Sequence, residues 1–220
     1  MAKYSCSSSI GMEYIKSMID TLFLKVGQYG SLIMSSIHTV FVRLFSKRTT
    51  IGGGTLLYYR SHIYNYSKKG KIIIGQHCSI GCSKRGFHVG MPFYTTLFND
   101  GVDSLIVIGN NCRINGAYIH SQRRIVIGDN CVISSNVNII DSNGHEVFSH
   151  DRTKGRDNPK EIIIGNNVWI GINVAILKGS VLGDNSVISA GCVVKGTVPP
   201  NSIVSSKYNT INIIKKNKYD

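Results

Sequence analysis

The sequence is short of acidic residues. It has 12 Asp and Glu against 25 Lys and Arg, which gives a formal net charge of +13 over 220 residues. Such an excess attracts phosphate groups, acidic polysaccharides, anionic membrane surfaces and nucleic acids. Nucleic acid is not the expected partner, because no recognised binding motif is present and the basic residues form no single run.

The sequence also lacks a long apolar run and a secretory signal. Residues 26–42 carry no charged side chain except a protonated His38, but this stretch is interrupted by polar residues and is shorter than the about 20 residues of a membrane-spanning helix. No apolar run follows a basic start, so a cytoplasmic protein is expected. Residues 1–70 form a partly helical extension, either packed on the rest of the chain or resting on the inner face of a membrane.

What the sequence does have is an aliphatic residue at every sixth position: Ile164, Ile170, Ile176, Leu182, Ile188 and Val194. A helix has 3.6 residues per turn and a half-buried strand alternates in twos, so neither explains this period. A period of six is typical of a solenoid in which each unit is one short strand and a turn. We predict that the aliphatic residues fill a narrow core.

Four of the six cysteines fall at the fifth position of a hexad, where the residues are small or β-branched: Cys78, Cys112, Cys131 and Cys192. They stand where other hexads have Ser or Val. We therefore predict buried free thiols rather than disulfides, which agrees with a reducing compartment.

Two longer runs make the repeat more specific, NNVWIG (166–171) and LGDNSVISAG (182–191). They resemble the hexapeptide-repeat acyltransferases, and in particular the galactoside, maltose and polysaccharide O-acetyltransferases. The resemblance implies an all-β, left-handed parallel β-helix with three hexads per coil. Handedness comes from the resemblance alone, because parallel crossovers are otherwise almost always right-handed. It further implies acetyl-coenzyme A as co-substrate, a carbohydrate acceptor and a homotrimer, to which exposed groups at Trp169 and Val187 would contribute.

Hexad spacing predicts the domain limits. Coils are expected over residues 71–205, followed by a tail at 206–220. Ile74 and Ile108 are 34 residues apart (108 − 74), and Ile127 and Ile164 are 37 apart (164 − 127), each more than the 18 residues of one coil. The excess places loops at about 82–104 and 142–161. Long excursions from a compact domain are usually functional.

The second loop contains His145, 24 residues before Trp169 (169 − 145). The resemblance implies that His145 is the general base. A sugar hydroxyl is too weak an acid to attack a thioester unaided, and a neutral imidazole takes its proton near pH 7. Asp141 and Glu146 are each expected either to orient the imidazole or to be solvated.

Other site residues follow from the same resemblance. Asn115 either contacts the acceptor or is an ordinary turn asparagine. His120 is expected to line the same cleft as His145. Trp169, which should point outward, is predicted to border the pocket for acceptor and coenzyme. Coenzyme A is expected to contact the backbone at Gly171-Ile172 and at Ala190-Gly191. Its phosphate groups are expected to contact the side chains of Lys178 and Lys195.

Metal binding is not predicted. A γ-class carbonic anhydrase is built on a similar helix but needs three zinc histidines. His145 and His150 have the spacing of its close pair, but they lie on the wrong loop with no third ligand in register.

The sequence therefore favours an acetyl-coenzyme A-dependent O-acetyltransferase that acts on a sugar hydroxyl of a bacterial surface polysaccharide or its precursor. An N-acetyltransferase acting on an amino sugar, and a non-enzymatic solenoid that binds partners, remain as alternatives.

Overall fold

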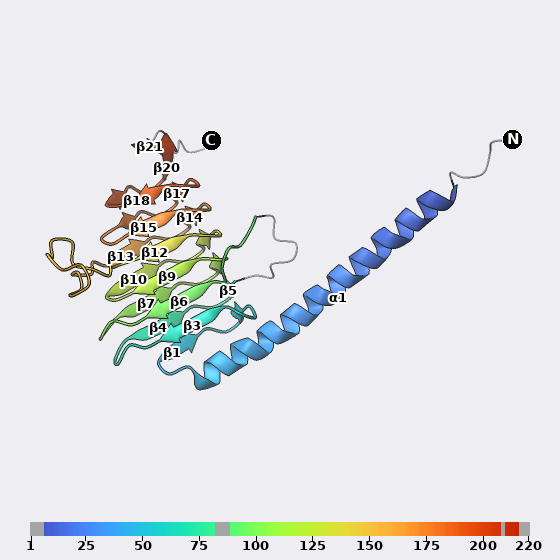
Figure 1. Cartoon of the computed structure of the whole chain (residues 1–220), viewed down its shortest axis with the longest axis horizontal. Coiled ribbons are helices and arrows are strands. Elements are labelled where there is room, and N and C mark those ends of the chain that lie inside the picture. The colour runs from blue at the N-terminus through green and yellow to red at the C-terminus, as the bar shows by residue number, and fades with distance from the viewer. Residues whose placement is uncertain (1–6, 82–88, 208–209, 216–220) are drawn as a thin grey trace.

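The chain forms a three-sided prism of β-strands preceded by one long helix. The computed structural model describes residues 7–81, 89–207 and 210–215. Helix α1 (Ser7–Phe45) meets the prism at its C-terminal end, and its N-terminal part extends away from it (Figure 1). Within the described residues, no helix is both long and apolar enough to cross a membrane.

Three parallel sheets make the sides of the prism, and the chain visits them in turn. The first sheet contains β1 (Thr49–Ile51), β4 (Lys71–Ile74), β7 (Leu105–Ile108), β10 (Arg124–Ile127), β13 (Ile162–Ile164), β16 (Val181–Leu182) and β19 (Thr197–Val198). The second contains β2 (Leu56–Leu57), β5 (Ser79–Ile80), β8 (Arg113–Ile114), β11 (Val132–Ile133), β14 (Trp169–Ile170), β17 (Val187–Ile188), β20 (Ser202–Lys207) and β21 (Thr210–Lys215). The third contains β3 (His62–Asn65), β6 (Thr96–Asn99), β9 (Tyr118–Ser121), β12 (Asn138–Ile140), β15 (Ala175–Leu177) and β18 (Val193–Val194). This is the predicted left-handed parallel β-helix.

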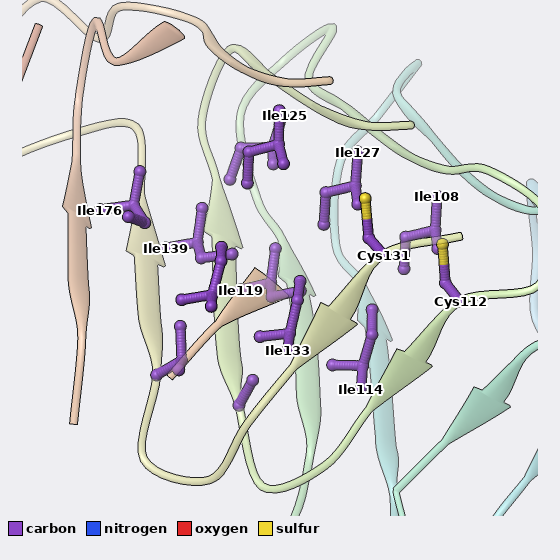
Figure 2. Close-up of a cluster of buried hydrophobic side chains, with 14 of the residues drawn as sticks. Ile108, Cys112, Ile114, Ile119, Ile125, Ile127, Cys131, Ile133, Ile139 and Ile176 are labelled. Atoms are coloured by element: carbon purple, nitrogen blue, oxygen red, sulfur yellow. The ribbon is translucent and has the colours of Figure 1, made fainter. Parts of the chain in front are cut away.

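Aliphatic side chains stacked in register fill the prism. In the first sheet, Ile108 pairs with Ile127, which pairs with Ile164. Figure 2 shows such residues from all three sides meeting in the centre. The predicted core residues are all at most 2% exposed: Ile164, Ile170, Ile176, Leu182, Ile188 and Val194. The predicted buried free thiols are confirmed at Cys78, Cys112, Cys131 and Cys192.

The corner between the first and second sheets explains two residue types in the hexads. A Cβ on Gly128 would lie 2.7 Å from the carbonyl oxygen of Gly165 in the next coil, so no larger residue fits there. Two residues later the chain enters the left-handed region, with φ of 59° at Asn130 and 53° at Asn167. Asparagine tolerates this conformation better than most other residues.

The coils begin earlier than residue 71, the predicted boundary. Strand β1 pairs with β4 from Thr49 onwards, so one complete coil lies within the predicted extension. The six-residue period is present in this coil, because Ile51, Leu57 and Ile63 follow one another at intervals of six residues. The residues that follow up to Gly70 interrupt the count, which hides this coil from a search for regular repeats.

Helix α1 covers the exposed edge of that first coil. The hydroxyl groups of Ser35 and Thr39 accept hydrogen bonds from the backbone N–H groups of Tyr59 and Leu57, each at 2.8 Å. The guanidinium of Arg43 donates to a carbonyl oxygen in the same coil. An uncovered strand edge would present unpaired backbone groups to other chains. The last turns of α1 therefore cap the solenoid.

The opposite end differs from the expected tail at 206–220. Strand β20 continues to Lys207, and β21 returns antiparallel to it, with Ser202 opposite Lys215. The alternation in β21, Ile211, Ile213 and then Ile214, is too short and irregular to be separated from a polar tail by sequence alone.

The two predicted loops have different outcomes. Strand β6 lies inside the first predicted loop, 82–104, and pairs with β3 and β9. Its outward aromatic residue, Phe98, and buried Asn99 obscure the hexad pattern there. Between β12 and β13 the structure has no strand, and this segment contains residues 142–161.

Candidate active site

Asp157 fastens the base of the loop that carries His145. Its carboxylate accepts hydrogen bonds from the Ser142 hydroxyl at 2.5 Å and from the N–H of Asn143 at 2.8 Å, and it forms an ion pair with Lys178. Burial raises the pKa of Asp157, but the hydrogen bonds from Lys178, Ser142 and Asn143 outweigh it and lower the pKa to about 2. At neutral pH the carboxylate is therefore ionised and holds both ends of the loop.

Lys178 has a structural role in addition to the one predicted for it. Its side chain is only 18% exposed, and its ammonium group also donates to the carbonyl oxygen of Asn158. Two of its three donors are thus used within the chain, and its contact with a phosphate group stays a prediction. Lys195 is exposed, and its contact with phosphate stays a prediction.

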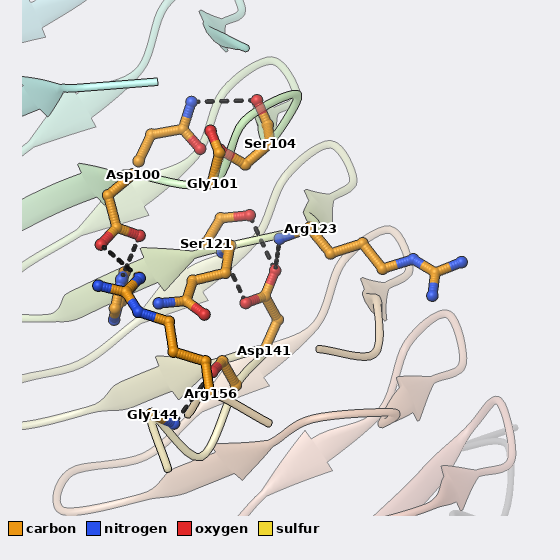
Figure 3. Close-up of polar contacts among 12 residues, drawn as sticks. Asp100, Gly101, Ser104, Ser121, Arg123, Asp141, Gly144 and Arg156 are labelled. Carbon is orange, nitrogen blue, oxygen red and sulfur yellow. Dashed lines mark hydrogen bonds and ion pairs between the residues drawn. The ribbon is translucent and has the colours of Figure 1, made fainter. Parts of the chain in front are cut away.

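Asp141 is a structural anchor and not an orienting group for the imidazole. It is fully buried and accepts hydrogen bonds from the Ser121 hydroxyl at 2.9 Å and from the N–H groups of residues 122–124, each at 2.8 Å (Figure 3). Both oxygens are thereby used by the corner that follows β9. Asp141 fixes the point at which the loop leaves the solenoid.

His145 lies in the exposed part of this loop. Its side chain is exposed, and neither ring nitrogen makes a hydrogen bond within the described part of the chain. Glu146, the other residue considered for orienting the ring, is also exposed. The imidazole is therefore open to a substrate.

His120 belongs to a charged cluster that the sequence did not reveal. Its Nε2 atom lies 2.9 Å from an Asp100 oxygen, and the other oxygen of Asp100 lies 3.8 Å from Arg156 Nη1. Arg156 comes from the loop that carries His145, so this loop and the outer face of β9 belong to one surface (Figure 3). Asp100 was missed because it directly follows β6, inside the first predicted loop.

Asn115 faces the backbone of its own corner. Its side-chain amide lies 3.0 Å from the carbonyl oxygen of Gly81, so the amide nitrogen is the atom that donates there. It also lies 3.3 Å from the carbonyl oxygen of Ile114. These contacts are those of a turn asparagine, and acceptor binding by Asn115 stays a prediction.

Trp169 lies on β14 and is 54% exposed, as its hexad position predicts.

Of the four backbone N–H groups expected near coenzyme A, two are hydrogen-bonded between coils and two are not. Gly171 donates its N–H to Ile188, and Gly191 donates to the carbonyl oxygen of Ile172, so these N–H groups are used between coils. The N–H groups of Ile172 and Ala190 make no hydrogen bond within the described residues and are free for a ligand.

Comparison with known proteins identifies the repeat. A profile described as "Bacterial transferase hexapeptide (six repeats)" matches residues 161–196. Galactoside O-acetyltransferase of Escherichia coli K12 is 36% identical over 156 residues, which cover 70% of this chain and 72% of that protein. The chain belongs to the hexapeptide-repeat acyltransferases.

Other hexapeptide-repeat acyltransferases are similar over different lengths. The polysialic acid O-acetyltransferase of Escherichia coli O1:K1 is 34% identical over 116 residues, or 52% of this chain and 37% of that protein. A hexapeptide-repeat acetyltransferase of Vibrio cholerae, solved with acetyl coenzyme A, superposes with a TM-score of 0.55 at 22% identity, over 96% of this chain and 90% of that one. That likeness supports the fold.

Among the residues described, no three His, Cys, Asp or Glu side chains are grouped in a way that would hold a metal ion.

Proposed function

We propose that this protein transfers an acetyl group from acetyl-coenzyme A to a hydroxyl of a carbohydrate, with His145 as general base. The observation that carries the proposal is the position of His145: an exposed imidazole with no partner in the described chain, on a loop anchored by Asp141 and Asp157. Membership of the acyltransferase family supplies the class of reaction.

The reaction needs two proton transfers and the exchange of a carbon–sulfur bond for a carbon–oxygen bond. Neutral His145 accepts the proton of the sugar hydroxyl while that oxygen attacks the thioester carbonyl carbon. The carbon–sulfur bond then breaks, and the coenzyme A sulfur leaves and receives the proton from the imidazolium. The chain itself needs no nucleophile, because the acetyl group passes directly between the two substrates.

Two backbone donors are suited to the charge that develops on the thioester oxygen. The unpaired N–H groups of Ile172 and Ala190 lie on neighbouring coils and belong to the motif runs around Trp169 and Ser189. Fixed donors that face a developing oxyanion are commonly a large catalytic contribution. Gly171 leaves room between the two donors, since a Cβ on it would lie 2.8 Å from the backbone nitrogen of Ala190. Gly191 is needed for its backbone conformation instead, because its φ is 76°.

A homotrimer is the assembly that we propose. Among the described residues, apolar side chains on the later coils and on the histidine loop are more than a third exposed: Val132, Phe148, Trp169, Val181 and Val193. Phe148 is 92% exposed, although it lies three residues from His145 (148 − 145). The two neighbouring subunits of a trimer would cover such groups and complete a cleft beside the loop.

We also propose peripheral contact of α1 with an anionic membrane surface. From Met18 into the turns that cap the first coil, one face of the helix exposes a series of apolar side chains: Met18, Leu22, Val26, Tyr29, Ile33 and Ile37. Arg43 and Arg48 lie where the helix meets the prism. Binding of the full chain to vesicles with and without anionic lipid, followed by sedimentation, tests this contact. Equal recovery in the absence and presence of vesicles would contradict it.

The function is tested by acetyl transfer to a panel of hydroxyl sugars and amino sugars, followed by mass spectrometry of the products. We expect ester formation, which mild base removes. An alkali-stable amide on an amino sugar would instead show N-acetylation. Absence of transfer to every acceptor, together with absence of coenzyme A binding by calorimetry, would favour a non-enzymatic solenoid.

A further inference from the structure

The outer face of the third sheet carries a row of contacting aromatic side chains. They lie on, or directly after, the first three strands of this sheet and are here called the aromatic ladder: His62, Tyr64, Tyr66, Phe98, Tyr118 and His120. The rings of Tyr64 and Tyr66 are stacked with centroids 5.9 Å apart, and Phe98 lies 5.6 Å from Tyr66 and 4.9 Å from His120. Tyr66 is 67% exposed. Tyr64 is also exposed, and the other four rings are partly buried. A row of accessible rings on one face is typical of a binding surface.

The ladder ends where the histidine loop begins. Along one outward column of the third sheet, Tyr64 pairs with Phe98, Phe98 with His120, and His120 with Ile140. Ile140 is the last residue of β12, and the loop that carries His145 follows it. The aromatic surface is therefore continuous with the candidate active site, and the contact of Asp100 with His120 and Arg156 spans the junction.

The charges around the ladder are mainly positive. Exposed Lys68 and Lys69 follow Tyr66 in the chain, and Arg60 donates to the hydroxyl of Tyr94 at 2.8 Å beside His62. One oxygen of Asp100 lies near His120 and the other near Arg156. Exposed Asp103 belongs to the turn whose Val102 carbonyl oxygen accepts a hydrogen bond from the N–H of Lys69. Four basic residues therefore surround the ladder against two acids. The charge of this surface is thus complementary to a polyanion.

We propose that the aromatic ladder binds an extended acidic glycan, several sugar residues away from the residue that is acetylated. This inference rests on the proposed function. Sugar rings present flat C–H faces that pack on aromatic rings, while their hydroxyl and carboxylate groups meet the surrounding polar and basic groups. Adjacent strands are about 4.8 Å apart, which is comparable to the length of one sugar residue. Three strands therefore accommodate about three residues of a chain that leads to His145.

The experiment measures binding to the full-length protein without acetyl-coenzyme A. Calorimetry with oligomers of sialic acid and of galacturonic acid, from one to six residues long, is compared with neutral maltose oligomers of the same lengths. In at least one acidic series we expect affinity to rise up to three or four residues and to weaken in high salt. Tyr66→Ala should raise the dissociation constant of the hexamer roughly five- to tenfold.

Phe45→Ala is the matched control, because Phe45 is also an aromatic residue that is 67% exposed but lies at the end of α1. This variant should bind the hexamer as the native protein does. His145→Ala should retain binding, which separates the ladder from catalysis. If acetyl transfer fails for all acceptors while length-dependent binding persists, the proposed function is contradicted and the ladder is not.

Two outcomes would overturn the inference. One is affinity that does not depend on length in either acidic series, even if short acceptors are acetylated. The other is a change of sedimentation coefficient in Tyr66→Ala or Phe98→Ala, because this would show that a second copy of the chain covers the face.

Discussion

Arg156 of the histidine loop faces Asp100 at the end of β6, with Nη1 3.8 Å from the carboxylate oxygen. The two residues are far apart in the chain, and the other Asp100 oxygen is held by His120 at 2.9 Å. Arg156 is next to Asp157 in the chain, so one part of the loop contacts Ser142 and Lys178 through Asp157 and the third sheet through Arg156. These contacts hold the part of the loop that follows His145 against the solenoid.

Replacing Arg156 with Ala should weaken the acceptor site modestly. The guanidinium is 67% exposed and its contact is long, so the pair contributes less than about 1 kcal/mol. We expect the acceptor KM to rise less than about fivefold with kcat nearly unchanged. Steady-state kinetics with Arg152→Ala as the control in the same loop would measure this, and equal effects of both variants would contradict a specific role for Arg156.

His145→Ala should remove most of the turnover. Loss of a general base typically costs about 10²–10⁴-fold in rate. The residue is exposed, so the melting temperature and coenzyme A binding should hardly change. Single-turnover rates across pH 5 to 9 provide the measurement, with His150→Ala as the control from the same loop. Near-normal turnover in His145→Ala would remove it from the mechanism and make His120 the next candidate.

Asp157→Asn should destabilise the loop in a pH-dependent way. The pKa of Asp157 is lowered to about 2 from 3.8, the ordinary value of an aspartate, so ionisation stabilises the folded state above the unfolded pKa. The difference of about 1.8 corresponds to about 2 kcal/mol. This contribution is complete at neutral pH and is lost progressively as the pH falls from about 5 to about 2.

Limited proteolysis of the loop at pH 7 and at about pH 3 checks that prediction. The variant should be cleaved faster than the native protein at pH 7, and the difference should be smaller at about pH 3. Asp151→Asn is the control, because its carboxylate binds within the exposed turn formed with Thr153. A difference between variant and native protein that grows on acidification would reverse the sign and contradict the assignment.

Gly128→Ala should destabilise the solenoid more than Gly53→Ala. A Cβ at Gly128 would lie 2.6 Å from the Asn166 side-chain oxygen and 2.7 Å from the Gly165 carbonyl oxygen, whereas a Cβ at Gly53 meets nothing within 4 Å. We expect a loss of about 1–3 kcal/mol at Gly128 from overpacking. Thermal unfolding followed by circular dichroism compares the two, and equal melting temperatures would show that the coils can separate at this corner.

The repeating part of the molecule was the part that could be predicted. The hexads that begin at Ile164 and Ile170 can be recognised in the sequence, because each hexad position is repeated many times and has the same environment in every repeat. Position within a hexad correctly gave the burial of Cys131 and the exposure of Trp169. The coil around Leu57 was missed because a single turn of the pattern, followed by an interruption, offers no such repetition.

The only candidate site residues that the sequence could indicate are those at a fixed distance from a recognisable motif. His145 was selected by its loop and its distance from Trp169. The pairs that position the loop, Lys178 with Asp157 and Arg156 with Asp100, join a coil to an excursion that has no periodicity. Nothing in the spacing fixes which cation of a loop meets which carboxylate of a coil, so such contacts become visible only in three dimensions.

The buried thiols have a consequence for how the molecule comes apart. Cys78, Cys112 and Cys131 lie at the same corner of three successive coils, and each sulfur lies 3.0 or 3.1 Å from a glycine carbonyl oxygen in the next coil. In a solenoid each coil contacts only its neighbours, so separation proceeds from an end or from a weak junction. The order in which a thiol reagent labels these cysteines would therefore show at which end the coils separate first. Early labelling of Cys78 would indicate the N-terminal end, and early labelling of Cys192 the C-terminal end.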